Sequence, residues 1–219
     1  MMKDIAIIGA GGFGREVKML IDQINGVKPK FNFIGYYDDG IAAGTLVNNY
    51  PVLGGVEDIN LLHKELYIVA AIGLPSLKKK LLDKITNSNI HFPTLIHPNV
   101  IVGNDNVTIG EGCIICAGNL ITIDITIGKH IIFNLACTVG HDTVIKDYCS
   151  FMPSVNLSGE VVIEEGVYVG TGAKIINQLA IGEWTIVGAG AVVYKSLPAR
   201  CTAVGIPAKP VKFHEQEGN

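Results

Sequence analysis

A histidine followed by a carboxylate, His141-Asp142, is the pair of residues in this 219-residue sequence best suited to chemistry. An imidazole titrates near neutral pH, so it can accept a proton from an attacking amine or hydroxyl. A neighbouring carboxylate can fix which ring nitrogen carries the proton, as in histidine–carboxylate catalytic pairs. Spacing alone also fits an exposed corner with no catalytic role, and by itself it favours that simpler interpretation.

A second candidate is the glycine-rich loop Gly9-x-Gly11-x-x-Gly14, with Asp38 and Asp39 following it by about 24 residues. This is the dinucleotide-binding fingerprint, in which glycines let the backbone approach a diphosphate and an acid binds a ribose. Taken alone it suggests NAD. However, the α/β part of the chain supplies only half of a doubly wound domain, so an NAD-linked oxidoreductase is the least favoured class.

The elements that would carry the glycine loop occupy residues 1–94. Short apolar runs ending in glycine or acidic residues predict strands, and apolar residues at helical spacing predict helices. Their alternation predicts a small parallel sheet. We expect strands at 5–8, 31–37 and 66–72, and helices at 15–24 and 75–85.

The element that would carry His141 is a six-residue repeat that begins at residue 101. The third place is a large apolar residue at every step from Ile109 to Val193, the first place is mostly small or β-branched, and the fourth is often glycine. Such a period means one unit stacked on itself. Three hexads would close a triangular coil of eighteen residues, with third-place residues inside.

Two further expectations follow from the register of the repeat. The fourth-place glycines should relieve strained backbone angles at the corners of the coil. Val102 and Ile109 lie seven residues apart instead of six, so a one-residue phase shift is expected at 104–106. His141 and Asp142 occupy the fifth and sixth places, which point outward at a corner.

Composition excludes several functional classes. The net charge of −3 and a pI near 6.0 provide no basic surface for nucleic acid. No apolar stretch is long enough for a membrane span, and the N-terminal apolar run is too short for a signal peptide. The five cysteines are therefore expected to be reduced and the protein cytoplasmic.

Metal binding is not expected either. Cys113 and Cys116 have the spacing of half a zinc site, but they occupy different places of the hexad and so face differently. Cys113, Cys137 and Cys149 all occupy the small first place and are interpreted as packing residues. Cys201 has no assigned role.

These patterns resemble the hexapeptide-repeat acyltransferases, whose closing V-G-x-P-A-K signature matches residues 204–209 here. Together with the glycine-rich N-terminal unit, they resemble the bacterial sugar acetyltransferases that include UDP-4-amino-sugar and perosamine N-acetyltransferases and sialic acid O-acetyltransferases. The resemblance implies a half-Rossmann nucleotide-sugar-binding domain at 1–94, a left-handed parallel β-helix at 95–210 and a C-terminal tail at 211–219. It also implies a homotrimer that binds acetyl-CoA between neighbouring β-helices.

The resemblance further implies roles for individual residues, with His141 as general base and Asp142 as the residue that orients it. The nucleotide sugar would contact Gly11, Gly12, Phe13, Asp38, Asp39, Gly73, Lys78 and Asn134. Acetyl-CoA would contact Ser150, Gly159, Thr171, Lys174, Ala189 and Lys209, and the Gly159 N–H would bind the oxyanion. Lys174 and Lys209 could equally be solvated surface charges, and Asn134 a stacked corner residue.

The expected reaction is N-acetylation of a 4-amino-deoxy sugar for surface-glycan synthesis. Phe13 stands where amino-sugar members of the family often carry histidine, so O-acetylation of a sialic acid or a related sugar is the alternative. An alternative of another class is a non-catalytic trimer that binds a nucleotide sugar.

Overall fold

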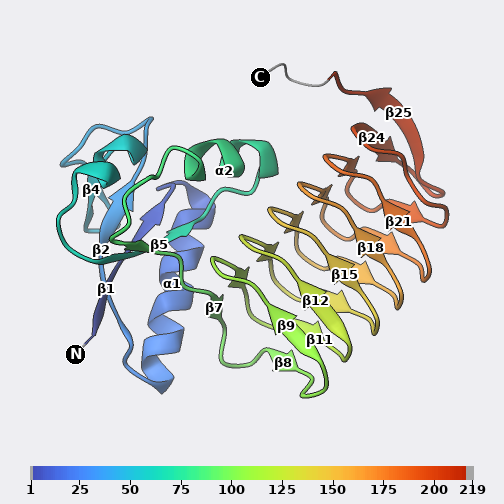
Figure 1. Cartoon of the computed structure of the whole chain (residues 1–219), viewed down its shortest axis with the longest axis horizontal. Coiled ribbons are helices and arrows are strands. Elements are labelled where there is room, and N and C mark those ends of the chain that lie inside the picture. The colour runs from blue at the N-terminus through green and yellow to red at the C-terminus, as the bar shows by residue number, and fades with distance from the viewer. Residues whose placement is uncertain (1, 216–219) are drawn as a thin grey trace.

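The computed structural model describes residues 2–215 and places them in an α/β unit followed by a β-helix (Figure 1). The α/β unit contains β1 (Lys3–Ile8), α1 (Gly12–Val27), β2 (Phe31–Tyr37), β3 (Leu46–Val47), β4 (Tyr50–Gly54), the 3-10 helix η1 (Val56–Leu61), β5 (Leu66–Ala70), α2 (Pro75–Leu82) and β6 (Ile90–His91).

One sheet organises the α/β unit, with strand order β3-β4-β2-β1-β5-β6. All neighbours pair in parallel except the β3–β4 hairpin. The three predicted strands and two predicted helices are present, whereas β3, β4, β6 and η1 were not predicted because such short segments carry no clear period. From β1 the chain continues to β2 on one side, and β5 lies on the other. Ligands of α/β sheets bind at the carboxyl ends of strands that flank such a switch point.

The β-helix is built from short strands that stack into three sheets, and each strand has two or three residues except β24 and β25, which have four and five. The eight-stranded sheet contains β7 (Leu95–Ile96), β10 (Ile114–Ile115), β13 (Ile132–Phe133), β16 (Ser150–Phe151), β19 (Tyr168–Val169), β22 (Ile186–Val187), β24 (Cys201–Val204) and the antiparallel β25 (Lys209–Phe213). The six-stranded sheet contains β8 (Ile101–Val102), β11 (Leu120–Ile121), β14 (Thr138–Val139), β17 (Asn156–Leu157), β20 (Lys174–Ile175) and β23 (Val192–Val193). The five-stranded sheet contains β9 (Val107–Ile109), β12 (Ile125–Ile127), β15 (Val144–Ile145), β18 (Val162–Ile163) and β21 (Ala180–Ile181).

The predicted register of the repeat is confirmed. Third-place side chains from Ile115 to Val193 are buried in one continuous core, and Ile109 at its edge is half-buried. Ile125 pairs with Val107, eighteen residues earlier, whereas Ile114 pairs with Leu95, nineteen residues earlier. The extra residue lies between β8 and β9, where the phase shift was predicted.

The expectation for the fourth-place glycines is wrong. Left-handed backbone falls at the sixth place instead, as at Asp142 (φ 56°) and Tyr148 (φ 63°). Fourth-place glycines are required by close approach of the next coil. A Cβ on Gly140 would lie 2.6 Å from the Gly159 nitrogen, and one on Gly170 would lie 2.6 Å from the Ala189 nitrogen.

The two units share a core. Leu95, Ile114 and Ile132 of the eight-stranded sheet pack with Val17 and Leu20 of α1. Cys116, half of the apparent zinc motif, belongs to this core, and all five cysteines are buried free thiols. Within residues 2–215 no group of side chains is arranged to hold a metal ion.

The boundaries between units can be compared with the predicted ones. Position 94 falls between the last strand of the α/β sheet, β6, and the first strand of the β-helix, β7. The predicted start of the tail at 211 falls inside β25, which pairs with β24, and residues 216–219 lie outside the described residues. Among residues 2–215, no helix has the length and apolar character needed to cross a membrane.

Replacing Gly170 with alanine should destabilise the β-helix, because the added Cβ meets backbone that cannot move without separating two coils. We expect the free energy of unfolding to fall by about 1–3 kcal/mol, measured by denaturant unfolding. Gly26→Ala is the matched control, since Gly26 lies in α1 with no atom within 4 Å of an added Cβ and alanine favours helix. Equal stability of the two variants would contradict the explanation by coil spacing.

Candidate active site

The His141-Asp142 pair forms a hydrogen-bonded unit at a corner of the β-helix. His141 Nδ1 lies 2.7 Å from Asp142 Oδ2, and both side chains are more than half exposed. The left-handed backbone of Asp142 turns the chain so that both side chains project from the same corner. With Nδ1 engaged, Nε2 is the ring nitrogen left to accept a proton, and it makes no hydrogen bond within residues 2–215.

The imidazole lies directly over Gly159, which occupies the same place one coil later. A Cβ on Gly159 would lie 2.6 Å from both Cε1 and Nε2 of His141, so only glycine leaves room for the ring. The coils are joined here by the Glu160 N–H, which donates to the His141 carbonyl oxygen at 2.8 Å. The predicted base and the predicted oxyanion donor are therefore neighbours.

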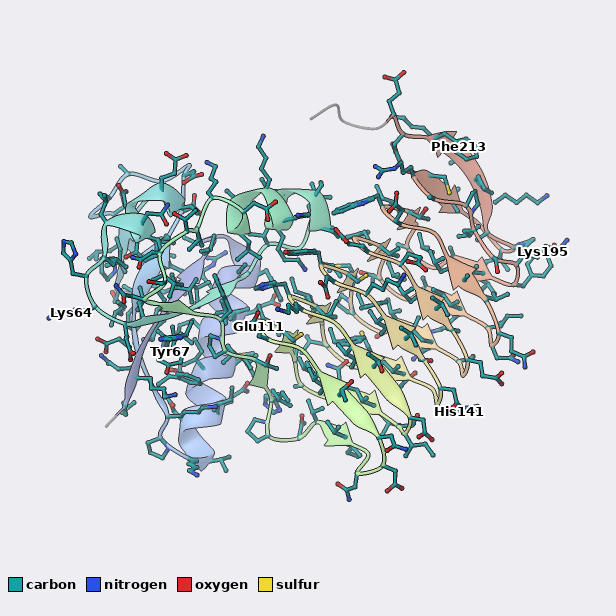
Figure 2. All side chains as sticks on the ribbon, in the orientation of Figure 1. Lys64, Tyr67, Glu111, His141, Lys195 and Phe213 are labelled. Atoms are coloured by element: carbon teal, nitrogen blue, oxygen red, sulfur yellow. The ribbon has the colours of Figure 1, made fainter. Side chains whose placement is uncertain are left out.

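The corner that carries His141 lies between the six-stranded and five-stranded sheets, because the residue falls between β14 and β15. In a three-sided coil this corner is opposite the eight-stranded sheet, against which the α/β unit packs. Figure 2 shows His141 at the outer edge of the coils, away from the α/β unit. Within one chain, His141 and the glycine loop therefore face different sides of the β-helix.

Most residues predicted to contact acetyl-CoA lie around the six-stranded sheet. Thr171 and Ala189 are exposed at its other corner, one coil apart, where the Gly190 N–H donates to the Thr171 carbonyl oxygen. Lys174 lies on the sheet between the two corners and donates to Asn156 Oδ1 and to the Ser154 carbonyl oxygen. The sheet thus joins the predicted base to the predicted cofactor residues.

Lys209 is the exception among the exposed cofactor candidates. It is exposed on β25 of the eight-stranded sheet.

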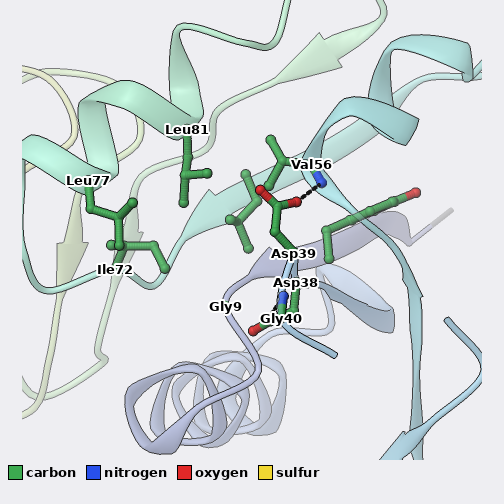
Figure 3. Close-up of a pocket in the computed structure, with 10 residues that line it drawn as sticks. Gly9, Asp38, Asp39, Gly40, Val56, Ile72, Leu77 and Leu81 are labelled. Carbon is green, nitrogen blue, oxygen red and sulfur yellow. Dashed lines mark hydrogen bonds between the residues drawn. The ribbon is translucent and has the colours of Figure 1, made fainter. Parts of the chain in front are cut away.

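Gly9, the first glycine of the loop, and the two aspartates line a cavity of about 290 Å³ at the carboxyl ends of β1 and β2 (Figure 3). Asp38 braces the loop, because its Oδ2 accepts from the Ala10 N–H at 2.8 Å and its Oδ1 from the Gly40 N–H at 2.9 Å. Asp39 Oδ1 accepts from the Val56 N–H at 2.7 Å, which ties the start of η1 to the same edge. The remaining walls are largely apolar and come from Ile8, Tyr37, Ile72, Leu77 and Leu81.

The local structure explains why glycine occupies each of these positions in the loop. Gly9 has φ 96°, and a Cβ on Gly14 would lie 1.9 Å from the Gly9 carbonyl oxygen, so α1 can pack on the loop only without side chains there. Gly11 is the N-cap of α1, and Gly12 is its first residue; both are exposed and no side chain caps the helix. An uncapped helix start with exposed glycines is suited to a phosphate group.

Three other predicted sugar contacts lie near the junction of the two units. Phe13 is half-buried against the shared core, and Asn134 is buried with its Oδ1 accepting from the Leu135 N–H. A Cβ on Gly73 would lie 3.9 Å from Met152 Cε, so the loop before α2 approaches the β-helix. Asn134 thus serves the corner turn in this structure.

Lys78 and Ser150 are not open to a ligand, contrary to the predicted contacts with a diphosphate and with CoA. Lys78 is 1% exposed and Ser150 is fully buried, and they contact each other at the junction of the units. Lys78 Nζ lies 3.0 Å from Ser150 Oγ and 3.3 Å from the Cys149 carbonyl oxygen. Burial lowers the pKa of Lys78 to about 7.

His130 is a buried histidine of this junction that the sequence did not single out. Its ring stacks on Tyr148 with a centroid distance of 5.5 Å and meets the edge of Phe92. Its Nδ1 is buried without a hydrogen-bond partner in the described residues, and burial, aided by the Lys78 charge, lowers its pKa to about 4. No periodicity distinguishes this sixth-place residue from an exposed corner histidine.

The neutral state of His130 makes stability depend on pH. Between pH 6.5 and 4 the unfolded chain binds a proton that the folded chain excludes, so the free energy of unfolding falls as the pH is lowered through this range. His130 accounts for about 3 kcal/mol of this fall in the free energy of unfolding. His130→Phe should remove this part of the difference in unfolding free energy between pH 6.5 and pH 4, while keeping the stack on Tyr148. Denaturant unfolding at the two pH values measures the difference. His63→Gln, at an exposed histidine, should show the same loss of unfolding free energy between pH 6.5 and pH 4 as wild type. An equally large loss in His130→Phe would contradict the assignment of this pH dependence to His130.

Comparison with known proteins places these features in a family. Residues 4–85 match the family model described as the PglD N-terminal domain. GDP-perosamine N-acetyltransferase of Escherichia coli O157:H7 is 34% identical over 169 residues, which are 77% of this chain and 76% of that protein. The structure of PerB from Caulobacter crescentus in complex with CoA and GDP-perosamine has a TM-score of 0.83 and 31% identity, covering 97% of this chain and 99% of that one.

A further solved structure is similar over the same extent. The acetyltransferase domain of PglB from Neisseria gonorrhoeae, in complex with acetyl coenzyme A, has a TM-score of 0.85 and 29% identity over 96% of this chain and 100% of that one.

An α/β unit with a glycine loop, joined to a six-residue β-helix with an exposed His–Asp corner, defines a class of hexapeptide-repeat transferases. The chain belongs to the hexapeptide-repeat sugar acetyltransferases, the family that includes GDP-perosamine N-acetyltransferase. The family and fold class predicted from the sequence are confirmed.

Proposed function

We propose that this protein is an acetyl-CoA-dependent N-acetyltransferase that acts on the amine of a nucleotide-linked 4-amino-deoxy sugar. The observation that carries the proposal is the exposed His141–Asp142 pair above Gly159, on a chain whose relatives are sugar N-acetyltransferases. The solved relatives bind CoA with GDP-perosamine or acetyl coenzyme A, which supports acetyl-CoA as the acetyl donor.

The chemistry asked of the protein is modest, because a thioester is already activated. The neutral sugar amine attacks the thioester carbonyl carbon, and the C–N bond forms while His141 Nε2 takes a proton from nitrogen. Asp142 holds the ring through Nδ1 and stabilises the imidazolium that results. The Gly159 N–H is the donor that we assign to the oxyanion. Collapse of the tetrahedral intermediate breaks the C–S bond, and CoA leaves as a thiol with the proton from His141.

We assign substrate binding to the two units separately. The cavity beside Asp38 and Asp39 would hold the nucleoside, and the exposed start of α1 at Gly11 and Gly12 would hold the diphosphate. Thr171, Ala189 and Lys174, with Lys209, are the residues proposed for CoA. In this division, residues 1–94 select the nucleotide sugar and residues 95–210 carry out transfer. The cytoplasm, where acetyl-CoA and nucleotide sugars are made, is the proposed location.

Two other functions remain open to test. O-acetylation of a sialic acid is the alternative because Phe13 stands where amino-sugar members of the family often carry histidine. A binding trimer without catalysis would bind a nucleotide sugar and release no thiol. Release of CoA thiol from acetyl-CoA, measured with UDP- and GDP-linked 4-amino sugars and with sialic acid, separates the three. Turnover with an amino sugar is the expected result.

His141→Ala should reduce that turnover on the order of 10²-fold or more, because it removes the imidazole that is assigned to accept the proton. Asp142→Asn should lose less, since it keeps the ring near its position but removes the negative charge. His63→Ala, at an exposed histidine of the α/β unit, should match wild type. Wild-type turnover in His141→Ala would end the assignment of His141 as the base.

A homotrimer with a shared site is proposed because His141 lies opposite the sheet that carries the α/β unit. The base would then act on a sugar bound by the α/β unit of a neighbouring chain. We expect His141→Ala and Gly40→Trp, which fills the nucleotide cavity, each to be inactive as pure trimers. Trimers reassembled from an equal mixture should regain about a quarter of wild-type turnover. Each site needs an intact His141 from one chain and an intact cavity from its neighbour, and half of the chains supply each.

Two outcomes would contradict the shared site. One is a monomer in light scattering, and the other is a reassembled mixture no more active than its components. Mixing of the two variants without dissociation serves as the control, since it leaves each trimer pure.

A further inference from the structure

The short helix α2 connects the nucleotide cavity to the β-helix, because its two faces contact different units. Leu77 and Leu81 on one face line the cavity (Figure 3). Lys78, on the adjacent side of the helix, reaches β16, where its Nζ contacts Ser150 Oγ at 3.0 Å and the Cys149 carbonyl oxygen at 3.3 Å. A change in the position of α2 relative to the β-helix would therefore move a wall of the cavity.

The hydrogen bonds of Lys78 are the only ones that join α2 to the β-helix within residues 2–215. The neighbouring contacts are less directional. Lys79 lies over the ring of Tyr148 at 5.1 Å, and Gly73 approaches the end of the Met152 side chain. Lys78 thus makes the directional contact between α2 and the β-helix, in addition to the apolar packing of the helix.

Burying an amine here is costly for a residue with only a packing role. The partners of Lys78 are a hydroxyl and a carbonyl oxygen, and within residues 2–215 no carboxylate forms a hydrogen bond or ion pair with its amine. A methionine of similar length would fill the space without the cost of removing an amine from water. What the lysine adds is a directed hydrogen bond to one strand of the β-helix.

We propose that Lys78 is a positioning residue for nucleotide-sugar binding, which through Ser150 holds α2 where Leu77 and Leu81 complete the cavity wall. The identity of the ligand rests on the proposed function, whereas the contact between α2 and β16 does not. In this role Lys78 does not touch the diphosphate and Ser150 does not touch CoA, which distinguishes it from the direct contacts implied by the family resemblance.

Four variants test the proposal in the full chain: Lys78→Met, Ser150→Ala, their combination, and Lys80→Met as the control at an exposed lysine of the same helix. We expect Lys78→Met and Ser150→Ala each to raise the KM for the nucleotide sugar by about 3- to 10-fold, the size of one lost hydrogen bond. Turnover number and the KM for acetyl-CoA should stay within about twofold. The double variant should be no worse than the single ones, because both remove the same contact.

A second measurement reports on α2 without any ligand. Amide hydrogen exchange of residues 78–82 should be faster in Lys78→Met and Ser150→Ala than in wild type, and unchanged in Lys80→Met. A rise in the KM for acetyl-CoA with an unchanged KM for the nucleotide sugar would overturn the proposal in favour of direct cofactor contact by Ser150. Unchanged exchange in α2 would overturn it as well.

Failure of the proposed function would look different. A wild-type protein that transfers no acetyl group to any nucleotide sugar would refute the transferase assignment. The exchange of α2 would still decide whether Lys78 holds the helix, because that measurement needs neither substrate.

Discussion

The structure depends on one constraint, which is that every coil of the β-helix must stack on the next at the spacing of paired strands. Stacking leaves room inside for one large side chain per hexad, and the third place supplies it without a gap from Ile109 to Val193. The same constraint acts outside the core. Gly140 and Gly170 are glycines because the backbone of the following coil lies where a Cβ would be.

Stacking also explains how an exposed corner can hold a site in fixed geometry. His141, Asp142 and Gly159 are not buried together in a cleft of one chain; they are aligned by the eighteen-residue offset between coils. Each corner is a column of equivalent positions, so a functional group at one coil has a defined neighbour above and below. A short hydrogen bond to Asp142 and an absent side chain at Gly159 are enough to orient the imidazole.

The α/β unit adds what a β-helix corner lacks, which is a partly open cavity with two aspartates in its lining. It is joined to the β-helix by an apolar core around Leu95 and Ile114, and by the buried contact of Lys78 with Ser150. The apolar core holds the units together, and the hydrogen bond between Lys78 and Ser150 orients α2 on the β-helix. The same junction buries His130, whose Nδ1 has no hydrogen-bond partner within residues 2–215, and this burial lowers the pKa of the imidazole.

The sequence by itself determined the periodic features of the protein. The six-residue period, the phase shift before β9, the glycine loop, and the three main strands and two helices of the α/β unit could all be predicted, because each depends on residues close together in the chain. The family and the His141–Asp142 pair followed from the same patterns. The left-handed sixth place was missed because glycine marks it only in some coils, as at Gly112 and Gly166, whereas residues such as Asp142 and Tyr148 occupy it in others.

Only the tertiary structure decided what happens where the two units meet. Lys78 and Ser150 are far apart in sequence, and both looked like ligand contacts until the packing of α2 on β16 buried them against each other. The burial of His130 and the placement of His141 opposite the α/β unit have the same origin. A buried contact between distant segments depends on the position of a whole helix, and that position is set by many weak apolar contacts that no single motif encodes.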